Sequence, residues 1–340
     1  MRLEDPTYYC MDSMPVNKIS VYITSYNQVD YLREAIESVL CQTLRPFEIV
    51  IVDDSSNDGS EDLILGYHHK YPELVRYHFN RQNLGVSKTR NIALRKLKGD
   101  YITFVDGDDL FEPRKLEVEM KRMEEDKNID FVYSNFINIS SNGNVLWEWH
   151  HQSDSDDDAF ERSLGFDWPK QTPLRSPLVK RDKWMSIGYY DESLYVFEDL
   201  DMMLRLTHGM NTSHVEEVLS CYRRHTEGIS SADIERNLQA LLYIFKKHKH
   251  LLSSLSDSKR KAVTKKMNKF LAQAHLNAAI YSKYNKSGHL PSLMRLFRAS
   301  MLNLNILFSK KALSILLSHL ARSREHEDKT PNETELTNME

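Results

Sequence analysis

The sequence predicts an α/β protein with parallel strands covered by helices, followed by an all-helical region. Three observations support this fold class. Short β-rich runs alternate with amphipathic helical stretches along the first half of the chain, an order that is typical of a parallel sheet. One run, residues 101–105, is apolar throughout, as expected of a central strand that is buried on both faces. After about residue 231 the strand-like runs stop and only helical patterns remain.

The first half of the chain is predicted to contain four strands and the helices that connect them. The strands are expected at residues 18–24, 47–52, 75–79 and 101–105. Asp30 is placed to cap the first helix, whose apolar residues recur at helical spacing up to Leu40. Further helices are expected at 61–71, at 86–97 with Gly99 as a closing glycine, and from Pro113 onward.

Carboxylates follow two of these strands at the point where each ends. Asp53 and Asp54 follow the second strand, and Asp106, Gly107 and Asp108 follow the fourth. Ligands of open α/β sheets bind at this edge, where two carboxylates can hold Mg²⁺ or Mn²⁺ and the cation can take its other oxygens from a nucleotide diphosphate. The acids also fit an ordinary strand-to-helix turn in which an Asp caps the next helix, a role that we expect for Asp109. The pattern by itself leaves both interpretations open.

The second half of the first domain is predicted to be less regular. Strands are expected at 130–135 and 144–149, joined by a hairpin turn at Asn142-Gly143. Residues 150–169 show no periodicity and contain Asp154, Asp156, Asp157 and Asp158, which favours a solvated loop; a lid over the site is the alternative. An ordered stretch at 177–190, a helix at 197–208 and a strand at 215–223 complete the pattern.

Composition narrows the class of protein. The 340 residues are 41% hydrophobic and 28% charged, with a net charge of −4, which argues against general nucleic-acid binding. The three cysteines have no metal-binding spacing, the first 17 residues have no apolar block, and no run is long enough to span a membrane. We therefore expect a cytoplasmic protein, possessing a domain at 18–230, a helical domain at 231–324, an N-terminal extension at 1–17 and a disordered tail at 325–340.

The helical region is basic. Nine Lys or Arg and one acid, Asp257, occur between Lys246 and Lys269. The last predicted helix, 290–320, has apolar residues on one face and Arg295, Arg298, Lys310 and Lys311 on the other. We favour a helical bundle with a basic outer surface; the alternative is peripheral contact with an anionic membrane surface or a lipid-linked acceptor.

Taken together, the motifs between Lys18 and Ser230 resemble those of the family 2 inverting glycosyltransferases, in particular the type that builds bacterial cell-surface polysaccharides. This resemblance implies the GT-A fold, a Rossmann-like mixed sheet with helices on both faces. It also implies a UDP-sugar, or a dTDP-sugar, as donor, and a saccharide or lipid-linked hydroxyl as acceptor. The helical region carries no comparable motif.

The resemblance assigns four residues to the nucleotide. I-S-V-Y-I-T-S-Y-N resembles the nucleotide-binding entry of the family, with Thr24 and Tyr26 near the base. V-D-D-S-S-N-D-G-S resembles the motif whose second acid, Asp54, contacts the uracil ring, and N-L-G-V-S-K-T-R-N resembles the segment whose Arg90 helps to hold the nucleotide. Ile23 departs from the proline of many members, which affects little because the residues facing the base follow it.

The resemblance assigns the chemistry to acids and one histidine. F-V-D-G-D-D matches the D-x-D position, which implies Asp108 as the ligand of Mn²⁺ or Mg²⁺ and Asp106 at the ribose or the metal. F-E-D-L-D-M-M-L-R resembles the motif that supplies the general base, here Asp199 with Glu198 as the fallback. Y-R-R-H resembles a closing motif in which His225 approaches the metal or the diphosphate.

Two other classes of function are considered. A nucleotidyltransferase also builds acidic metal sites on α/β sheets, but Ser25-Tyr26-Asn27-Gln28 lacks the glycine-rich phosphate loop expected after its first strand. A non-catalytic sugar-nucleotide-binding protein with the same fold would bind UDP without turnover. The acids at 106, 108 and 199 speak against this second alternative.

Overall fold

The structure is a computed structural model that describes residues 17–150, 159–165, 175–225, 234–284 and 289–317. The predicted N-terminal extension up to residue 16, the acids at 154–158 and the predicted tail lie outside the described residues. The chain divides into two compact units. The first comprises residues 1–160 and 170–228, and the second comprises residues 161–169 and 229–340.

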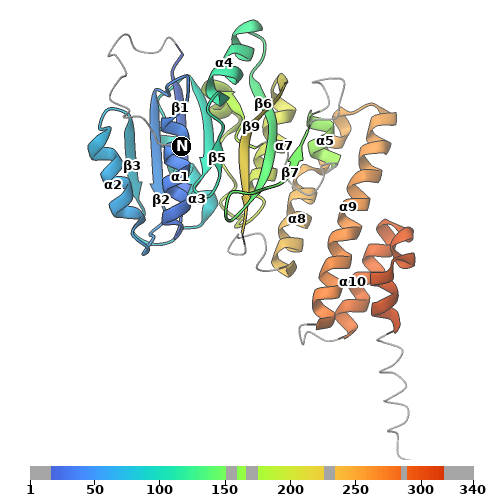
Figure 1. Ribbon diagram of the computed structural model, residues 1–340. Coiled ribbons are helices and arrows are strands. Elements are labelled where there is room, and N and C mark those ends of the chain that lie inside the picture. The colour runs from blue at the N-terminus through green and yellow to red at the C-terminus, as the bar shows by residue number, and fades with distance from the viewer. Residues whose placement is uncertain (1–16, 151–158, 166–174, 226–233, 285–288, 318–340) are drawn as a thin grey trace, which may run out of the picture. The chain divides into compact units, whose positions relative to one another are not determined.

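The first unit is built on a nine-stranded sheet, and Figure 1 labels most of its strands and the helices around it. The strands are β1 (Ile19–Ser25), β2 (Glu48–Asp53), β3 (Val75–Phe79), β4 (Tyr101–Asp106), β5 (Leu110–Phe111), β6 (Phe131–Ser140), β7 (Val145–Trp149), β8 (Leu178–Lys180) and β9 (Thr212–Arg224). The helices of the first unit are α1 (Val29–Leu40), α2 (Ser60–Lys70), α3 (Val86–Lys96), α4 (Lys115–Glu125), α6 (Arg181–Ile187) and α7 (Glu198–Gly209). Helix α5 (Ala159–Gly165) begins at the end of the first unit, and most of its residues belong to the second.

The sheet is mixed. Its strand order is β3-β2-β1-β4-β8-β6-β9-β5, and β7 pairs with β6 beside this path. The four strands from β3 to β4 are parallel, as the alternation of strands and helices predicted. The short strand β8 runs antiparallel to both β4 and β6, which makes the second half of the sheet mixed. The predicted mixed α/β sheet is therefore confirmed.

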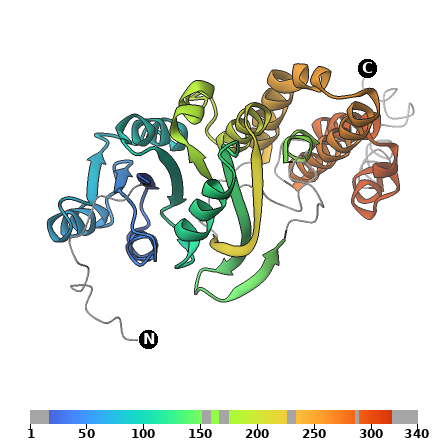
Figure 2. The same cartoon turned by 90° about the horizontal axis from the view of Figure 1, so that it is seen from above.

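Helices cover both faces of this sheet because side chains alternate along each strand. In β1, Ile19, Val21 and Ile23 join a hydrophobic core formed with α1, α2 and α4. Tyr22 points to the other face, where its ring stacks on Phe104 of β4 at 5.2 Å between centroids. Figure 2 shows α1 and α4 on one side of the sheet and α3 on the other.

Three local predictions are wrong, each for a physical reason. Asp30 lies inside the first turn of α1, and the N–H of Val29 donates instead to Asp58 Oδ2 at 2.7 Å. Gly99 does not close α3 with a positive φ; a Cβ there would lie 2.4 Å from the carbonyl oxygen of Lys18, so the glycine permits close packing against β1. Residues 159–165, predicted as part of a loop, form helix α5.

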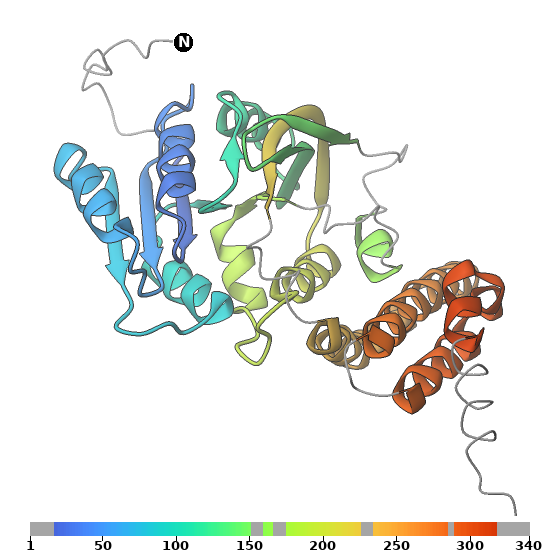
Figure 3. The same cartoon turned by 60° about the horizontal axis from the view of Figure 1, so that its bottom comes forward.

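The described residues of the second unit are helical, as predicted. They form α8 (Ile234–His248), α9 (Asp257–Tyr284) and α10 (His289–Leu302), with shorter 3₁₀ turns at Lys249–Ser254 and Leu304–Phe308. Figure 3 shows α9 and α10 side by side. Ala272, Ala279 and Ala299 are fully buried between them, where their small side chains let the two backbones approach closely. Among the described helices, none has both the length and the apolar character needed to cross a bilayer.

Candidate active site

The site lies where the C-terminal ends of β1 and β4 meet. The chain order reverses between these strands, and ligands of open α/β sheets bind at such a switch point. Thr24 and Asp106 are register partners at this edge, and the N–H of Gly107 donates to the carbonyl of Thr24 at 3.0 Å. A Cβ on Gly107 would lie 3.0 Å from the carbonyl oxygen of Thr24 and 3.2 Å from Ser25 Cβ. Glycine is therefore favoured here, because the turn after β4 packs directly against β1.

Arg90 of α3 is the buried centre of the site. Its guanidinium binds Asp106 Oδ1 at 2.6 Å through Nη2 and Glu198 Oε1 at 3.1 Å through Nη1. The same guanidinium lies 5.2 Å from the ring centroid of Phe104 and 5.4 Å from that of Tyr190. Burial lowers the pKa of Arg90, but the two carboxylates outweigh it and hold the pKa well above the ordinary value. Arg90 is thus a permanent cation that ties the end of β4 to the start of α7.

The carboxyl groups around Arg90 have raised pKa values. Burial raises the pKa of Asp106 more than Arg90 lowers it, and the nearby charge of Asp108 adds to the increase. Burial raises the pKa of Glu198 to about 7, against the opposing effect of Arg90, and Asp199 raises it further. Several acids confined to one buried place are typical of a site that binds a cation or transfers protons.

Glu198 and Asp199 have different environments although they are neighbours in sequence. Glu198 is 5% exposed and holds Arg90. Asp199 is partly exposed, accepts the N–H of Leu200 at 2.7 Å, and interacts electrostatically with Asp106 and Arg175. The structure therefore brings both predicted base candidates to the site and gives Glu198 the ion pair with the buried cation.

The end of β9 approaches the turn after β4. His225 Nε2 lies 2.8 Å from Asp108 Oδ2, and the His225 ring lies 5.3 Å from that of Tyr31. The backbone N–H of Arg223 donates to Asp109 Oδ1 at 2.9 Å, and its Nε donates to the carbonyl of Asp108 at 2.9 Å. The prediction that Asp109 caps a helix is wrong, because its carboxylate accepts this bond from β9. Burial and then Asp108 raise the pKa of Asp109 well above the ordinary value.

Asp108 and His225 are the residues that best fit a divalent cation. A carboxylate oxygen and an imidazole nitrogen are ligands that Mn²⁺ accepts, and Mg²⁺ commonly uses one or two carboxylates together with substrate phosphates. Asp106, the third predicted ligand, is bound to Arg90. In the part of the chain that the structure describes, no group of three or more acidic, His or Cys side chains is arranged to hold a metal. The donor set fits a cation that completes its coordination with water and a diphosphate.

The predicted nucleotide-binding residues lie on the β1 and β2 side of this edge. Thr24 is 8% exposed, whereas Tyr26 presents 48% of its surface to solvent. Asp54 is buried and accepts three hydrogen bonds: from Asn80 Nδ2 at 2.7 Å and from the N–H groups of residues 84 and 85 at 2.8 Å each. Asp54 therefore holds the loop before α3, and its contact with a base stays a prediction.

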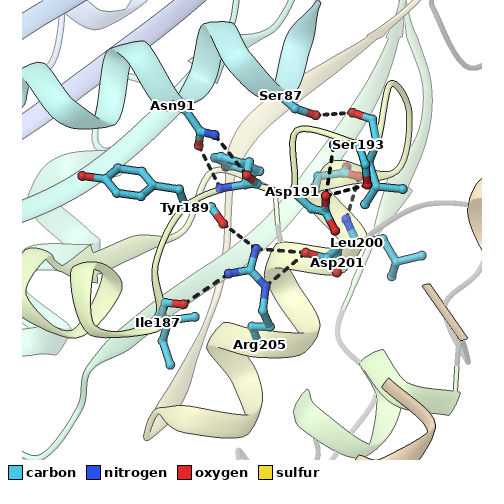
Figure 4. A network of polar contacts seen from close by, with 12 residues as sticks. Ser87, Asn91, Ile187, Tyr189, Asp191, Ser193, Leu200, Asp201 and Arg205 are labelled. Carbon is cyan, nitrogen blue, oxygen red and sulfur yellow. Dashed lines mark hydrogen bonds and ion pairs between the residues drawn. The ribbon is translucent and has the colours of Figure 1, made fainter. Parts of the chain in front are cut away.

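The segment before α7 is fixed by side chains from two helices, as Figure 4 shows. Arg205 of α7 pairs with Asp201 at 2.9 Å and donates to the carbonyl groups of Ile187 and Tyr189 at 3.3 and 2.9 Å. Asn91 of α3 binds the backbone of residue 190 through both its Nδ2 and its Oδ1. These bonds fix the position at which α7 begins.

The residue that starts α7 has an uncommon backbone conformation. Phe197, directly before Glu198 and Asp199, has a φ of 60°, in the left-handed region that favours glycine. Such a residue persists where the surrounding structure holds it, and strained residues cluster at functional sites. The hydrogen bonds of Figure 4 supply the restraint, so the two acids are presented at a defined position.

The motifs did not identify two residues of the site, the aromatic Tyr190 and the cationic Arg175. Tyr190 covers one side of Arg90, and its hydroxyl lies 2.9 Å from that of Tyr22. Arg175 lies over the ring of Tyr222, with 3.7 Å between its Cζ and the ring centroid, and interacts electrostatically with Asp106 and Asp199. In the sequence, Arg175 stands within T-P-L-R-S-P-L-V, which has neither helical nor strand-like periodicity. Nothing in this stretch marks Arg175 as a residue of the site.

Comparison with known proteins agrees with this geometry. The family model "Glycosyl transferase family 2" matches residues 20–183. An uncharacterized glycosyltransferase of Methanocaldococcus jannaschii is 30% identical over 208 residues, which are 60% of this chain and 70% of that relative. The chain belongs to glycosyltransferase family 2. It is therefore a glycosyltransferase that uses a nucleotide sugar, and the nucleotidyltransferase alternative is not supported.

Solved structures agree on the fold. Staphylococcus aureus TarS has a TM-score of 0.62 at 18% identity, over 84% of this chain and 49% of TarS. Crystal structures of TarS residues 1–349 contain UDP or UDP-GlcNAc. The mannosyltransferase PcManGT of Pyrobaculum calidifontis, solved with GDP-Man and Mn²⁺, has a TM-score of 0.53 at 17% identity, over 90% of this chain and 80% of PcManGT. The predicted GT-A fold is thereby confirmed.

Proposed function

We propose that this family 2 member is an inverting, divalent-cation-dependent enzyme that transfers a sugar from a UDP-sugar to a hydroxyl of a saccharide or lipid-linked acceptor. The observation that carries the proposal is the convergence of acids from distant segments. Asp106 and Asp108 come from the end of β4, Glu198 and Asp199 from the start of α7, and electrostatic interactions connect the two groups.

In the proposed reaction Asp199 is the general base. The acceptor hydroxyl attacks the anomeric carbon of the sugar, its proton passes to the Asp199 carboxylate, and the bond to the diphosphate breaks with its electron pair leaving on the diphosphate. Attack opposite the leaving group inverts the anomeric configuration and requires no covalent intermediate. The partial exposure of Asp199 supports this assignment over Glu198, which is buried against Arg90.

Asp108 and His225 would hold the cation, which supplies positive charge to the departing diphosphate when it is bound. Asp106 has a supporting role in this proposal, since Arg90 already binds it at 2.6 Å. Arg90 in turn keeps the end of β4 and the start of α7 at a fixed separation. The nucleotide then lies toward β1 and β2, with Tyr26 and Thr24 near the base.

The choice of UDP over other nucleotides rests on two supports. One is the likeness of the β1 and β2 motifs to those of UDP-sugar enzymes in the family. The other is the fold that the chain shares with TarS, which is solved with UDP and UDP-GlcNAc. PcManGT has the same fold with GDP-Man, so the fold alone does not select the base. A dTDP-sugar, which differs from UDP-sugars at the base methyl and the ribose, is the alternative donor.

A release assay tests the proposal. Purified protein is incubated with UDP-, dTDP- and GDP-sugars, with Mn²⁺, Mg²⁺ or EDTA, and with a panel of saccharide and lipid-linked acceptors, and the nucleoside diphosphate released is measured. We expect release from UDP-sugars that requires the metal and is abolished in Asp108→Ala. The exposed Asp182 of α6, outside the site, gives a matched control as Asp182→Ala. Metal-independent release, or an active Asp108→Ala variant, would contradict the proposal.

A further inference from the structure

We propose that Arg175 binds the diphosphate of the nucleotide sugar. This inference rests on the proposed function and adds a residue that no motif assigns. Arg175 precedes β8, on a segment of the chain far in sequence from the strands that carry the acids. Three observations carry the inference: the way its guanidinium is held, the charges that surround it, and the contrast with the buried Arg223.

The guanidinium of Arg175 is held in place by a ring and by a strained backbone. Its Cζ lies 3.7 Å from the ring centroid of Tyr222, close enough for stacking between the two planar groups. The next residue, Ser176, is buried and has a φ of 48°, in the region that L side chains rarely adopt. Its carbonyl accepts a hydrogen bond from Thr103 Oγ1 of β4 at 3.0 Å. The backbone is thus fixed to the central strand directly beside Arg175.

The surroundings of Arg175 are the acids of the site. Burial lowers its pKa, but Tyr222, Asp109, Asp199 and Asp106 together raise it above the ordinary value. The side chain is therefore charged, and it faces the same carboxylates that flank the proposed cation ligand. An anion that enters beside this cation would come under the attraction of both positive groups.

Arg223, a buried arginine of the same site, has its hydrogen-bonding groups occupied by the protein, because it binds Glu34 together with the carbonyl groups of residues 108 and 141. Arg90 forms ion pairs with two carboxylates through its terminal nitrogens, although its Nε has no hydrogen-bond partner among the described residues. The Nε of Arg175 is also buried and has no hydrogen-bond partner among the described residues. A guanidinium presents its donors as a planar fork that matches phosphate oxygens, so a diphosphate is the ligand that fits.

Binding of UDP and of uridine to the full chain tests this inference without turnover. Calorimetry in Mn²⁺ is performed on the wild type, Arg175→Met and Arg175→Lys. We expect Arg175→Met to weaken UDP about 10- to 100-fold, as for loss of a charged hydrogen bond, and to leave uridine unchanged. Arg175→Lys should recover part of the loss. Arg224→Met is the matched control, because Arg224 lies 5.0 Å from the same ring.

The outcomes separate this inference from the proposed function. Unchanged UDP affinity in Arg175→Met would overturn it, whether or not the wild type releases UDP from a sugar donor. An equal loss of UDP and uridine affinity, accompanied by a lower unfolding temperature, would instead make Arg175 a structural residue. A raised KM for the acceptor with unchanged UDP affinity would assign the arginine to the acceptor and also overturn the inference.

A separate observation concerns the second unit, where we propose that the exposed apolar face of residues 294–317 binds an anionic lipid surface. Seven large apolar side chains in this segment are more than half exposed, from 52% at Leu313 to 88% at Phe308. They are Met294, Phe297, Met301, Leu304, Phe308, Leu313 and Leu317. From the sequence, most of these residues were predicted to belong to the core of the helical bundle. The structure shows that they are exposed and that other apolar residues of the segment fill the core.

The bundle core is filled by other residues of the same segment. Leu296, Ala299, Ile306, Ala312 and Ile315 are buried against α9. Phe297 and Met301 alternate with them around α10 and are 65% and 72% exposed. The bundle prediction therefore holds for the inner side chains only. Seven large apolar side chains exposed within 24 residues are more than the scattered single ones of an ordinary surface, which indicates an interaction surface.

The positive charge of the residues between Asp257 and Glu325 indicates an anionic partner. No Asp or Glu occurs between Asp257 and Glu325, whereas fourteen of the 45 Lys and Arg residues do. The rest of the chain has 31 bases against all 49 acids. A helical segment that exposes Phe, Leu and Met and whose own charged residues are all basic is suited to the interface of an anionic bilayer.

Vesicle binding by the full chain tests this second proposal. We expect co-sedimentation with phosphatidylcholine vesicles that contain phosphatidylserine, weaker binding at high salt, and little binding to phosphatidylcholine alone. The variant Phe297→Ser/Met301→Ser/Phe308→Ser should reduce the partition coefficient at least about tenfold. The variant Val145→Ser/Leu146→Ser is the control, since these two exposed apolar residues lie on β7 of the other unit.

Two results would overturn the membrane proposal. One is equal binding of the wild type and the triple variant to the anionic vesicles. The other is a wild-type dimer in light scattering that the triple variant converts to a monomer, which would assign the face to a second copy of the chain.

Discussion

Lys115 and Arg90 are both buried cations of the first unit, and they belong to opposite faces of the sheet. Lys115 of α4 pairs with Glu119 of the same helix at 2.5 Å, and neither side chain is exposed. Arg90 of α3 pairs with Asp106 and Glu198, which belong to a strand and a helix far apart in sequence. The first cluster is a local pair of one cation and one anion. The second joins three elements and has an excess of carboxylates.

The difference between the two clusters indicates which of them is functional. Burial lowers the pKa of Lys115 and raises that of Glu119, and each partner offsets the other. Such a pair contributes little net stability, and well-packed apolar residues can replace it. Around Arg90 burial and the surplus of acids raise the pKa values of Asp106 and Glu198, and the charge of a divalent cation would favour their ionised forms. An unbalanced buried cluster at a strand edge is therefore the better sign of a site.

The largest effect that we expect is on turnover. Asp199→Asn removes the proposed proton acceptor and preserves the shape of the side chain. Turnover should fall by roughly 10²- to 10⁴-fold, the usual contribution of a general base, while the affinity for UDP stays within about twofold. Initial rates and UDP calorimetry measure the two quantities. A collapse of UDP affinity would instead give Asp199 a structural role, and loss of turnover in Glu198→Gln alone would transfer the base function to Glu198.

The next effect is on stability and concerns the other cluster. Lys115→Met leaves Glu119 buried without its cation, and we expect a loss of about 3–5 kcal/mol in the free energy of unfolding. The double variant Lys115→Met/Glu119→Leu should recover most of this loss, and its UDP affinity should match that of the wild type. Chemical denaturation and calorimetry measure both. If the double variant is as unstable as Lys115→Met alone, the Lys115–Glu119 pair is not replaceable by apolar residues, and the contrast with the Arg90 cluster fails.

The sequence predicted the position of the site because the carboxyl ends of parallel strands meet at one edge. Asp106 and Asp108 follow the central strand, and the structure brings them to Glu198 and Asp199 as the resemblance implied. Local patterns also predicted seven of the nine strands, since runs of apolar and β-branched residues indicate buried strands. The short strands β5 and β8 were not predicted. The ion pair between Glu198 and Arg90 could not be predicted, because it depends on how α3 and α7 pack against each other.

Residues that act through long-range packing were not predictable either. Arg175 lies near the acids because its neighbour Ser176 bonds to Thr103 of β4, and no local spacing records that contact. Gly99 was read as a helix terminator because glycine commonly ends helices, yet here it permits two backbones to approach. Asp109 was assigned to a helix cap, although its partner is a strand that comes more than a hundred residues later.

A third effect sharpens the comparison through pH. The pKa of Glu198 is raised, mainly by burial, from 4.5 to about 7 in the folded chain. The folded state therefore keeps a proton that the unfolded state releases between these two values. The contribution of Glu198 to stability is fully present below pH 4.5 and is lost as the pH rises to about 7.

Glu198→Gln should remove this pH dependence. At about 1.4 kcal/mol per pKa unit, the wild type should lose about 3 kcal/mol relative to Glu198→Gln between pH 4.5 and pH 7 in metal-free buffer. Denaturation at several pH values measures the difference. Lys115→Met/Glu119→Leu is the control, because it should leave the part of the pH dependence that is due to Glu198 unchanged. Parallel curves for the wild type and Glu198→Gln would contradict the raised pKa.

The smallest effect concerns Asp54, whose buried carboxylate is stabilised by three hydrogen-bond donors. Asp54→Asn turns one acceptor toward the 84–85 loop into a donor, which should lower the free energy of unfolding by about 1–3 kcal/mol. If Asp54 also contacts the uracil ring, UDP should lose more affinity than GDP, so that the preference between them narrows. We expect this narrowing in a calorimetric comparison of the two nucleotides. Equal losses for UDP and GDP would limit Asp54 to holding the loop, and the base would then be selected by other residues at the end of β1.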